Sequence, residues 1–207
     1  DLESELKRKV NLENDANCFA LSEAVDGAGK DSNVVFGVII GTGVGGGVVV
    51  NKKVLQGRNN ICGEWGHITL PNKTNDEKKY VTKCYCGKNG CIETYISGPG
   101  FSNSFNLRYS KDYNTHEIIK GYEENDKICI EAIDRYIDHL ARGLSIVCNI
   151  LDPDIIVLGG GMSNIDFIYE HIDDALKKYI FSDFFHTKIV KNTHGDSGGV
   201  RGAAWLS

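Results

Sequence analysis

The chain has 207 residues, 41% of them hydrophobic and 25% charged, which is typical of a globular protein with a sizeable core. Its formal charge of −5 and its pI near 5.7 exclude a general attraction for nucleic acid or for an anionic membrane. No apolar run approaches the roughly 20 residues that span a bilayer, and the odd number of cysteines, seven, indicates a reduced, cytoplasmic chain.

The first predicted elements are two helices and a pair of strands. Residues 1–10 predict a short amphipathic helix, and residues 17–27 predict a second one. The β-branched runs 34–40 and 48–50 predict strands, joined by a glycine-rich turn. A short extended piece follows the second strand, and the polar residues 72–80 predict a solvated loop.

The second half of the chain alternates helices with strands. Residues 97–109 and 115–124 predict two helices, and residues 126–151 predict a long helix that ends in the core before Asp152-Pro153. The remaining predicted elements of the chain are a buried strand at 154–160, a helix at 164–180, a strand at 187–191 and a short helix at 200–207. The fold class is therefore α/β.

Three of the seven cysteines lie within eight residues. Cys84, Cys86 and Cys91 have the spacing C-x-C-x4-C, and glycines interrupt the last interval. Disulfides in so short a loop would be strained, and three thiols leave one unpaired. Three thiolates with His67 as fourth ligand would form a closed tetrahedral site, so the sequence predicts structural zinc. Unpaired surface thiols are the alternative.

The glycine-rich segment GTGVGGG follows the first predicted strand. It runs into a second strand rather than a helix, so it is no dinucleotide fingerprint, and it lacks the lysine of a P-loop. A row of backbone N–H groups there can bind an anion, and Thr42 adds a hydroxyl donor. Both a phosphate cradle and a simple tight turn remain open.

Several carboxylates lie in or beside these motifs. Glu64, His67 and Glu93 would come together if zinc joined His67 to the cysteines, and each can accept a hydrogen bond from a sugar hydroxyl. Asp15 precedes the second helix, where it would be either an N-cap or a general base for a hydroxyl nucleophile.

Five motifs occur in one order along the chain: ENDAN (13–17), GTGVGGG (41–47), GEWGH (63–67), CYCGKNGCIE (84–93) and LGGGMS (158–163). Together they resemble the sugar kinases of the ROK family over nearly the whole chain. Within that family the sequence looks most like bacterial fructokinases, which phosphorylate fructose or mannose, with N-acetylglucosamine kinases as the near alternative. The resemblance implies an actin-like ATPase, ribonuclease H-like α/β fold with two lobes that close on a cleft.

The resemblance also implies a role for each motif. Asp15 would be the catalytic base, and His67 would bind zinc with one ring nitrogen and face the sugar with the other. ATP would arrive with Mg²⁺, and the partners would be a hexose and ATP, with a possible homodimer. The implied contact residues are Asn14, Glu64, His67 and Glu93 for the sugar; Cys84, Cys86, Cys91 and His67 for zinc; Gly41, Thr42, Gly43, Val44, Gly45, Gly46 and Gly47 for the phosphates; and Gly159, Gly160 and Gly161 beside the adenosine.

Chains of this family begin with an Asp-x-Gly-Gly-Thr loop that holds the phosphates, and this sequence has no such loop. We therefore expect a chain that lacks a small lobe and has doubtful activity alone. The expected parts are a remnant of that lobe (1–32), a large lobe (33–195) and a C-terminal helix that would pack on the absent lobe (196–207). Apolar side chains of the first and last parts should then be exposed, among them Leu2, Leu6, Val10, Phe19 and Trp205.

Two other classes of function compete with an enzyme. The same family includes sugar-sensing regulators, but the negative charge and the lack of a visible helix-turn-helix argue against one. A zinc-ribbon interaction module would explain the cysteines but not the glycine segment or ENDAN.

Overall fold

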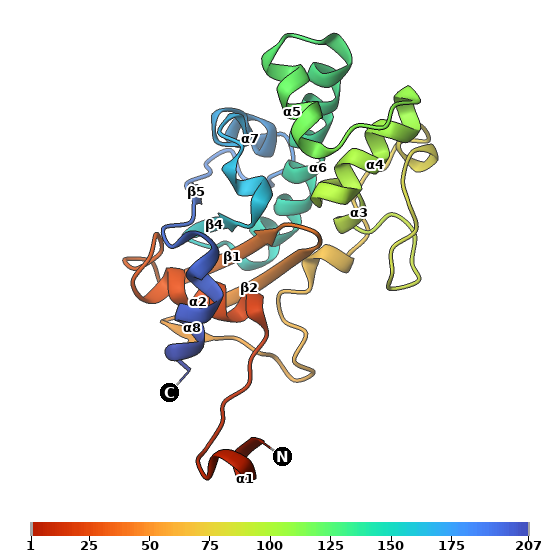
Figure 1. Ribbon diagram of the computed structural model, residues 1–207. Helices are drawn as coiled ribbons and strands as arrows, with labels where there is room; N and C mark the ends of the chain where they lie inside the picture. The colour runs from red at the N-terminus through yellow and green to blue at the C-terminus, as the bar shows by residue number, and fades with distance from the viewer. Residues whose placement is uncertain (1, 207) are drawn as a thin grey trace.

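A five-stranded mixed sheet forms the centre of the computed structural model, which describes residues 2–206 (Figure 1). The strand order is β3-β2-β1-β4-β5; β2 pairs antiparallel with both β1 and β3, and β4 and β5 run parallel to β1. Consecutive strands joined by tight turns pair antiparallel, whereas β4 returns to the sheet through helices. The strands are β1 (Val34–Ile40), β2 (Val44–Val50), β3 (Lys53–Val54), β4 (Ile155–Gly159) and β5 (Lys188–Lys191).

Helices cover both faces of this sheet. The helices are α1 (Leu2–Leu6), α2 (Asp15–Val25), α3 (Glu93–Ile96), α4 (Gly98–Tyr109), α5 (Thr115–Glu123), α6 (Lys127–Leu151), α7 (Phe167–Lys177) and α8 (Gly198–Ala204), with short 3-10 turns at Trp65–His67, Glu77–Lys79, Gly161–Asn164 and Gly195–Ser197. The expected α/β class and element order are confirmed. None of the helices in residues 2–206 is both long enough and apolar enough to cross a membrane.

Helix α2 lies directly on β1 and β2, and α8 lies beside it (Figure 1). Gly47 stands opposite Gly37 in the sheet, and a Cβ at Gly47 would come within 2.6 Å of the Ala16 carbonyl oxygen. A Cβ at Gly202 of α8 would come within 1.6 Å of the Cys18 carbonyl oxygen. Gly45 to Gly47 are strand residues, so the prediction that all of 41–47 is a turn is wrong. Close packing of α2 on the sheet therefore explains Gly37 and Gly47.

The C-terminal segment is held on α2 by two acidic groups, the buried Glu23 and the half-buried Asp26. The Glu23 carboxylate is fully buried and accepts hydrogen bonds from the backbone N–H groups of Ala28, Thr193 and His194. Asp26 pairs with His194 and with Arg201 of α8. These contacts join the first and last thirds of the chain into one layer.

This layer corrects one expectation about exposure. Phe19 is 3% exposed, because Gly159 and Gly198 both lie against its ring. Leu2, Leu6 and Trp205 are exposed as expected, whereas Val10 is half-buried. The division into 1–32, 33–195 and 196–207 stays a prediction, and its terminal residues Asp1 and Ser207 lie outside the described part of the chain.

The larger core lies between the other face of the sheet and helices α3 to α7. Leu140 and Leu144 of α6 are fully buried in it together with Ile156 of β4. The prediction that α6 ends in the core is wrong for its last turn, where Ile150 is 81% exposed. Asp152, in a left-handed conformation, is the C-cap of this helix, and Pro153 follows it.

Candidate functional site

The start of α2 presents two polar side chains at the surface. Asn14 is the N-cap, and its Oδ1 accepts a hydrogen bond of 2.8 Å from the Ala16 backbone N–H. Asp15 occupies the first position of the helix and is exposed. The capping role that we considered for Asp15 therefore belongs to Asn14, and the Asp15 carboxylate is left near the positive end of the helix dipole.

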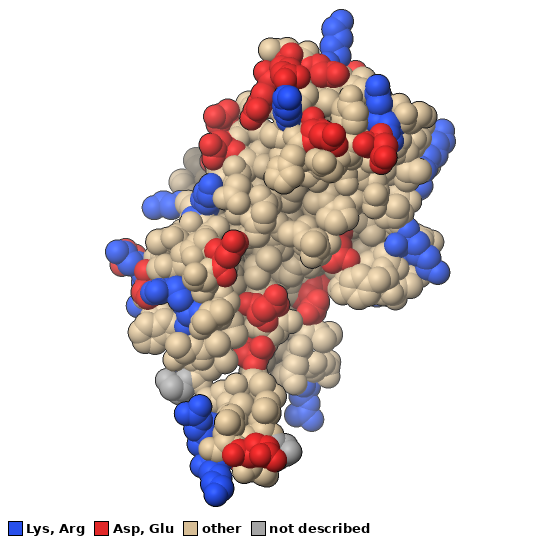
Figure 2. Space-filling view, in the orientation of Figure 1, with Lys and Arg blue, Asp and Glu red and all other residues tan. Residues whose placement is uncertain are grey.

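A cavity of about 360 Å³, which we call the acidic cavity, opens beside Asp15. Figure 2 shows acidic side chains in the middle of this face of the molecule and basic side chains mostly around its edge. The cavity brings together most of the residues that the sequence singles out for sugar and phosphate: Asn14, Asp15, Gly41, Thr42, Gly43, Val44, Gly45, Gly46, Glu64, His67 and Glu93, with Ala16, Ile39 and Tyr85.

Glu93 connects two parts of this cavity wall. Its Oε2 accepts a hydrogen bond of 3.0 Å from the Val44 backbone N–H, and the Cys84 thiol lies 3.7 Å from its Oε1. The side chain therefore joins the start of β2 to the cysteine loop. This contact also occupies the N–H of Val44, which the sequence assigned to the phosphates.

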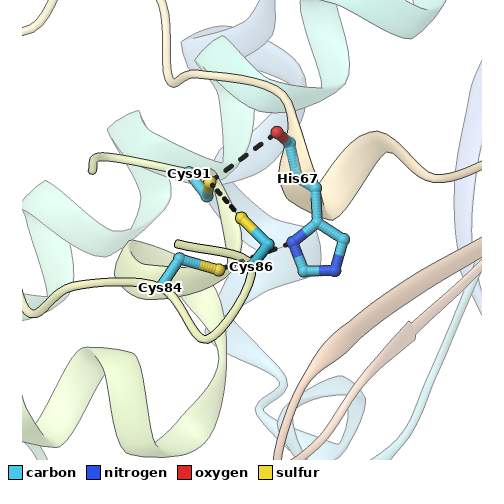
Figure 3. A group of neighbouring side chains, drawn as sticks. All are labelled: His67, Cys84, Cys86 and Cys91. Atoms are coloured by element: carbon cyan, nitrogen blue, oxygen red, sulfur yellow. Dashed lines mark hydrogen bonds between the residues drawn. The ribbon is translucent and has the colours of Figure 1, made fainter. Parts of the chain in front are cut away.

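The four predicted metal ligands converge from two loops, and their side chains point toward one another (Figure 3). All four ligand atoms lie within 4.8 Å of one another. His67 Nδ1 is 3.5 Å from Cys84 Sγ, and Cys86 Sγ is 3.6 Å from Cys91 Sγ. In a tetrahedral zinc site with bonds of about 2.0–2.3 Å, ligand atoms are about 3.5–3.8 Å apart. These distances and the Cys3His donor set fit zinc.

The backbone supports the same cluster. Thr69 and Cys91 form an isolated antiparallel bridge, and the N–H groups of Leu70 and Ile92 donate to the carbonyl oxygens of Gly90 and Ile68. Burial and the neighbouring thiols raise the pKa of Cys91 to about 12. Metal binding at this cluster must therefore displace protons from the thiols.

A second cavity, of about 550 Å³ and largely apolar, meets the acidic cavity at the turn after β1. Both cavities are lined by Gly41 and Thr42. Among residues 2–206, no hydrogen-bond acceptor takes the backbone N–H of Thr42 or Gly43, so these donors remain available to a ligand. The turn 41–43 is thus the part of the glycine segment that can bind an anion between two cavities.

The apolar cavity includes residues that the sequence did not indicate. Thr115, His116 and Ile119 belong to α5, and Met162 and Ile165 follow β4; all five line it. Gly161 lies here as expected. Gly47, Gly159 and Gly160 line neither cavity: the first two pack against α2, and Gly160 has a φ of +80° that favours glycine.

A buried charged cluster behind the cysteine loop was also missed. Glu77 accepts a hydrogen bond of 2.9 Å from His139 Nε2 and pairs with the Arg142 guanidinium, and all three side chains are buried. Arg142 Nη1 also donates to the carbonyl oxygens of Pro71 and Asn72, at 3.1 and 3.2 Å. The prediction of a solvated loop at 72–80 is therefore wrong for Glu77. The sequence signal for this cluster was the presence of His139 and Arg142, three residues apart, in the apolar part of α6.

Replacing Arg142 with alanine is expected to lower the free energy of unfolding by about 3–5 kcal/mol, because Glu77 would stay buried without its cation. Urea unfolding at pH 7 measures this loss. Arg135→Ala is the matched control: Arg135 lies two turns earlier in α6 and donates to the Tyr109 hydroxyl at the half-buried helix surface. An equal loss in both variants would contradict a special role for the buried cluster.

The cluster also predicts that stability falls as the pH is lowered. Burial alone would raise the pKa of Glu77, but hydrogen bonds from His139 and Arg142 hold it well below its usual 4.5. Burial lowers the pKa of His139 below 6.5. As the pH falls below 6.5, His139 therefore takes up a proton in the unfolded chain before it does so in the folded chain. Glu77 does the same below pH 4.5, and both proton uptakes favour unfolding. Urea midpoints at pH 7 and pH 4.5 should differ less in a Glu77→Gln, His139→Gln double variant than in the unaltered protein.

Comparison with known proteins identifies the family. The sequence model described as "ROK family" matches residues 1–207. An N-acetyl-D-glucosamine kinase from Vibrio atlanticus is 44% identical over 210 residues, covering 100% of this chain and 70% of that protein. The crystal structure of the ROK hexokinase from Thermus thermophilus matches with a TM-score of 0.87 and 28% identity, covering 98% of this chain and 66% of that one. The chain belongs to the ROK family.

Membership in the ROK family confirms the expected actin-like ATPase fold, and the kinase relatives identify an ATP-dependent sugar kinase. The chain spans about 70% of the length of its curated relatives. A ROK transcriptional regulator homologous to the Escherichia coli MLC protein shares the fold at 24% identity, with a TM-score of 0.82 over 98% of this chain and 52% of that one. The expected closeness to fructokinases is not shown; the curated relative named above is an N-acetyl-D-glucosamine kinase.

Proposed function

We propose that this ROK protein is an N-acetyl-D-glucosamine kinase, which transfers the γ-phosphoryl group of ATP to a hydroxyl of the amino sugar. One observation carries the proposal: a cavity lined by carboxylates and a cavity lined by apolar side chains meet at the Gly41–Thr42 turn. A kinase needs this arrangement, because its sugar and its nucleotide must meet at the transferred phosphate.

The acidic cavity would hold the sugar. Asn14, Glu64, His67 and Glu93 line it and offer amide, carboxylate and imidazole groups, which suit a ring of neighbouring hydroxyls. Glu93 is already fixed by the Val44 N–H, so its carboxylate is held in place before a sugar arrives. Fixed acceptors of this kind reduce the cost of ordering the site on binding.

Asp15 would be the general base. Its carboxylate is exposed at the acidic cavity and can accept the proton of the sugar hydroxyl as that oxygen attacks the γ-phosphorus. The free N–H groups of the 41–43 turn would hold phosphate oxygens, and the apolar cavity beside Gly161 and Met162 would hold the adenosine. Mg²⁺, arriving with ATP, would neutralise the phosphate charge.

The Cys3His cluster would hold one structural zinc ion. Its four ligands leave no open coordination position, so the zinc would fix the two loops rather than bind the substrate. His67 is itself one of the ligands, and Glu93 begins α3 two residues after Cys91, which makes the zinc site a support for the sugar-binding wall. A cytoplasmic location and a homodimer remain predictions.

Steady-state kinetics with a panel of sugars tests the proposal. We expect kcat/KM for N-acetyl-D-glucosamine to exceed that for glucose, N-acetylmannosamine, fructose and mannose by about tenfold or more. The wrong sugar would leave polar groups of the site without a hydrogen-bond partner, which raises the free energy of its transition state. Preference for fructose would overturn the substrate. Sugar binding without phosphoryl transfer would instead indicate a sugar-sensing regulator.

A further inference from the structure

Tyr85 lies between two of the predicted zinc ligands and lines the acidic cavity. Its hydroxyl is 2.8 Å from His67 Nε2, and its ring meets the imidazole edge-on, with centroids 5.0 Å apart and an interplanar angle of 88°. The residue is 82% exposed, so it contributes little to the core. Neither the motifs nor the proposed sugar contacts give it a role.

The contact with His67 uses the ring nitrogen on which the proposed function depends. His67 Nδ1 faces the thiols, at 3.5 Å from Cys84 Sγ. A nitrogen that ligates a metal carries no proton, so the proton of a neutral imidazole is on Nε2. With zinc on Nδ1, Nε2 would therefore donate to the Tyr85 hydroxyl. A sugar hydroxyl that accepts from the same N–H must take the place of this tyrosine.

We propose that Tyr85 sets the sugar affinity of the acidic cavity by occupying His67 Nε2 in the sugar-free protein and yielding it when the sugar binds. The inference rests on the proposed function, because it takes the acidic cavity as the sugar site. The exchange is feasible since Tyr85 is largely exposed: its ring can swing away from His67 without opening the core. The protein thus keeps the zinc-bound histidine oriented before the sugar arrives, and the sugar binds more weakly as a result.

Tyr85→Phe removes the competing hydroxyl and keeps the ring. We expect the dissociation constant for N-acetyl-D-glucosamine, measured by titration calorimetry without ATP, to fall by about two- to tenfold, the range of one neutral hydrogen bond. KM should fall by a similar factor, because the sugar no longer has to displace the Tyr85 hydroxyl. The value of kcat should stay unchanged, because the Tyr85–His67 contact is absent from the sugar-bound state of both proteins. Tyr85→Ala should tighten sugar binding as well.

Tyr80→Phe is the matched control, because Tyr80 lies in the same loop with its ring under Arg108 and does not line the acidic cavity. It should leave the dissociation constant unchanged. Unchanged or weaker sugar binding in both Tyr85 variants, at full zinc content, would overturn the inference and leave the proposed function intact. Failure of the unaltered protein to bind any sugar of the panel would overturn both.

Discussion

Replacing Asp15 with asparagine is expected to lower kcat for sugar phosphorylation by about 10²–10⁴-fold, the usual contribution of a general base. Asparagine has the same shape, and its Oδ1 can still accept the hydrogen bond of 2.8 Å that Ala16 N–H donates to Asp15. The dissociation constant of the sugar, measured by calorimetry, should therefore change little. This separation of catalysis from binding would identify Asp15 as the residue that takes the proton.

Glu13→Gln is the control for Asp15→Asn. Glu13 lies two positions earlier and accepts hydrogen bonds from the Asn17 and Gln56 side chains, but it does not line the acidic cavity. Its replacement should leave kcat within about twofold of the unaltered value, because Glu13 does not line the acidic cavity and the glutamine Oε1 can still accept the hydrogen bond from Asn17. Near-normal turnover in Asp15→Asn, measured beside this control, would show that Asp15 is not the base.

Removal of one ligand from the Cys3His cluster is expected to have the second largest effect. Cys91→Ala should lose the bound zinc and weaken sugar binding by about 10²-fold or more, because small displacements of groups that position a substrate have effects of this size. Cys91 is fully buried, forms an antiparallel bridge with Thr69 and lies two residues before Glu93, so its loss frees both segments that carry sugar contacts. Metal analysis by mass spectrometry and calorimetry measure the two effects.

Cys62→Ala provides the matched control. Cys62 is a half-buried thiol that packs against the larger core and lies outside the cluster. The Cys62→Ala protein should therefore retain one zinc ion per chain and normal sugar affinity. A Cys91→Ala protein with full sugar affinity would contradict the role of the cluster as a support for the sugar-binding wall. Less than one zinc ion per chain in unaltered protein, purified without chelator, would contradict zinc itself.

Local patterns predicted the sheet and the metal cluster from the sequence. The β-branched run of β1 and the apolar run of β4 are too regular to be anything but buried strands, and both were placed to within a residue or two. The spacing of Cys84, Cys86 and Cys91 predicted ligands that the fold does bring within reach of His67. In each case neighbouring residues carried the information.

The features that the sequence did not predict depend on long-range contacts. The sequence places Gly47 in a phosphate loop, but it is glycine because the Ala16 carbonyl lies against it. Glu77 lies in a polar segment whose composition predicts a solvated loop. It is buried because the fold brings it into contact with Arg142, which is 65 positions later in the chain. Tyr85 lies at an ordinary position between two cysteines, and its importance comes from the direction of the His67 ring.

The central claim is phosphoryl transfer to N-acetyl-D-glucosamine, and product analysis tests it most directly. The purified full-length gene product would be incubated with N-acetyl-D-glucosamine, ATP and Mg²⁺, and the products followed by ³¹P NMR and mass spectrometry. We predict one ADP and one N-acetyl-D-glucosamine phosphate per ATP consumed. ADP and inorganic phosphate without a sugar phosphate, or no reaction from a protein that binds the sugar, would contradict the account.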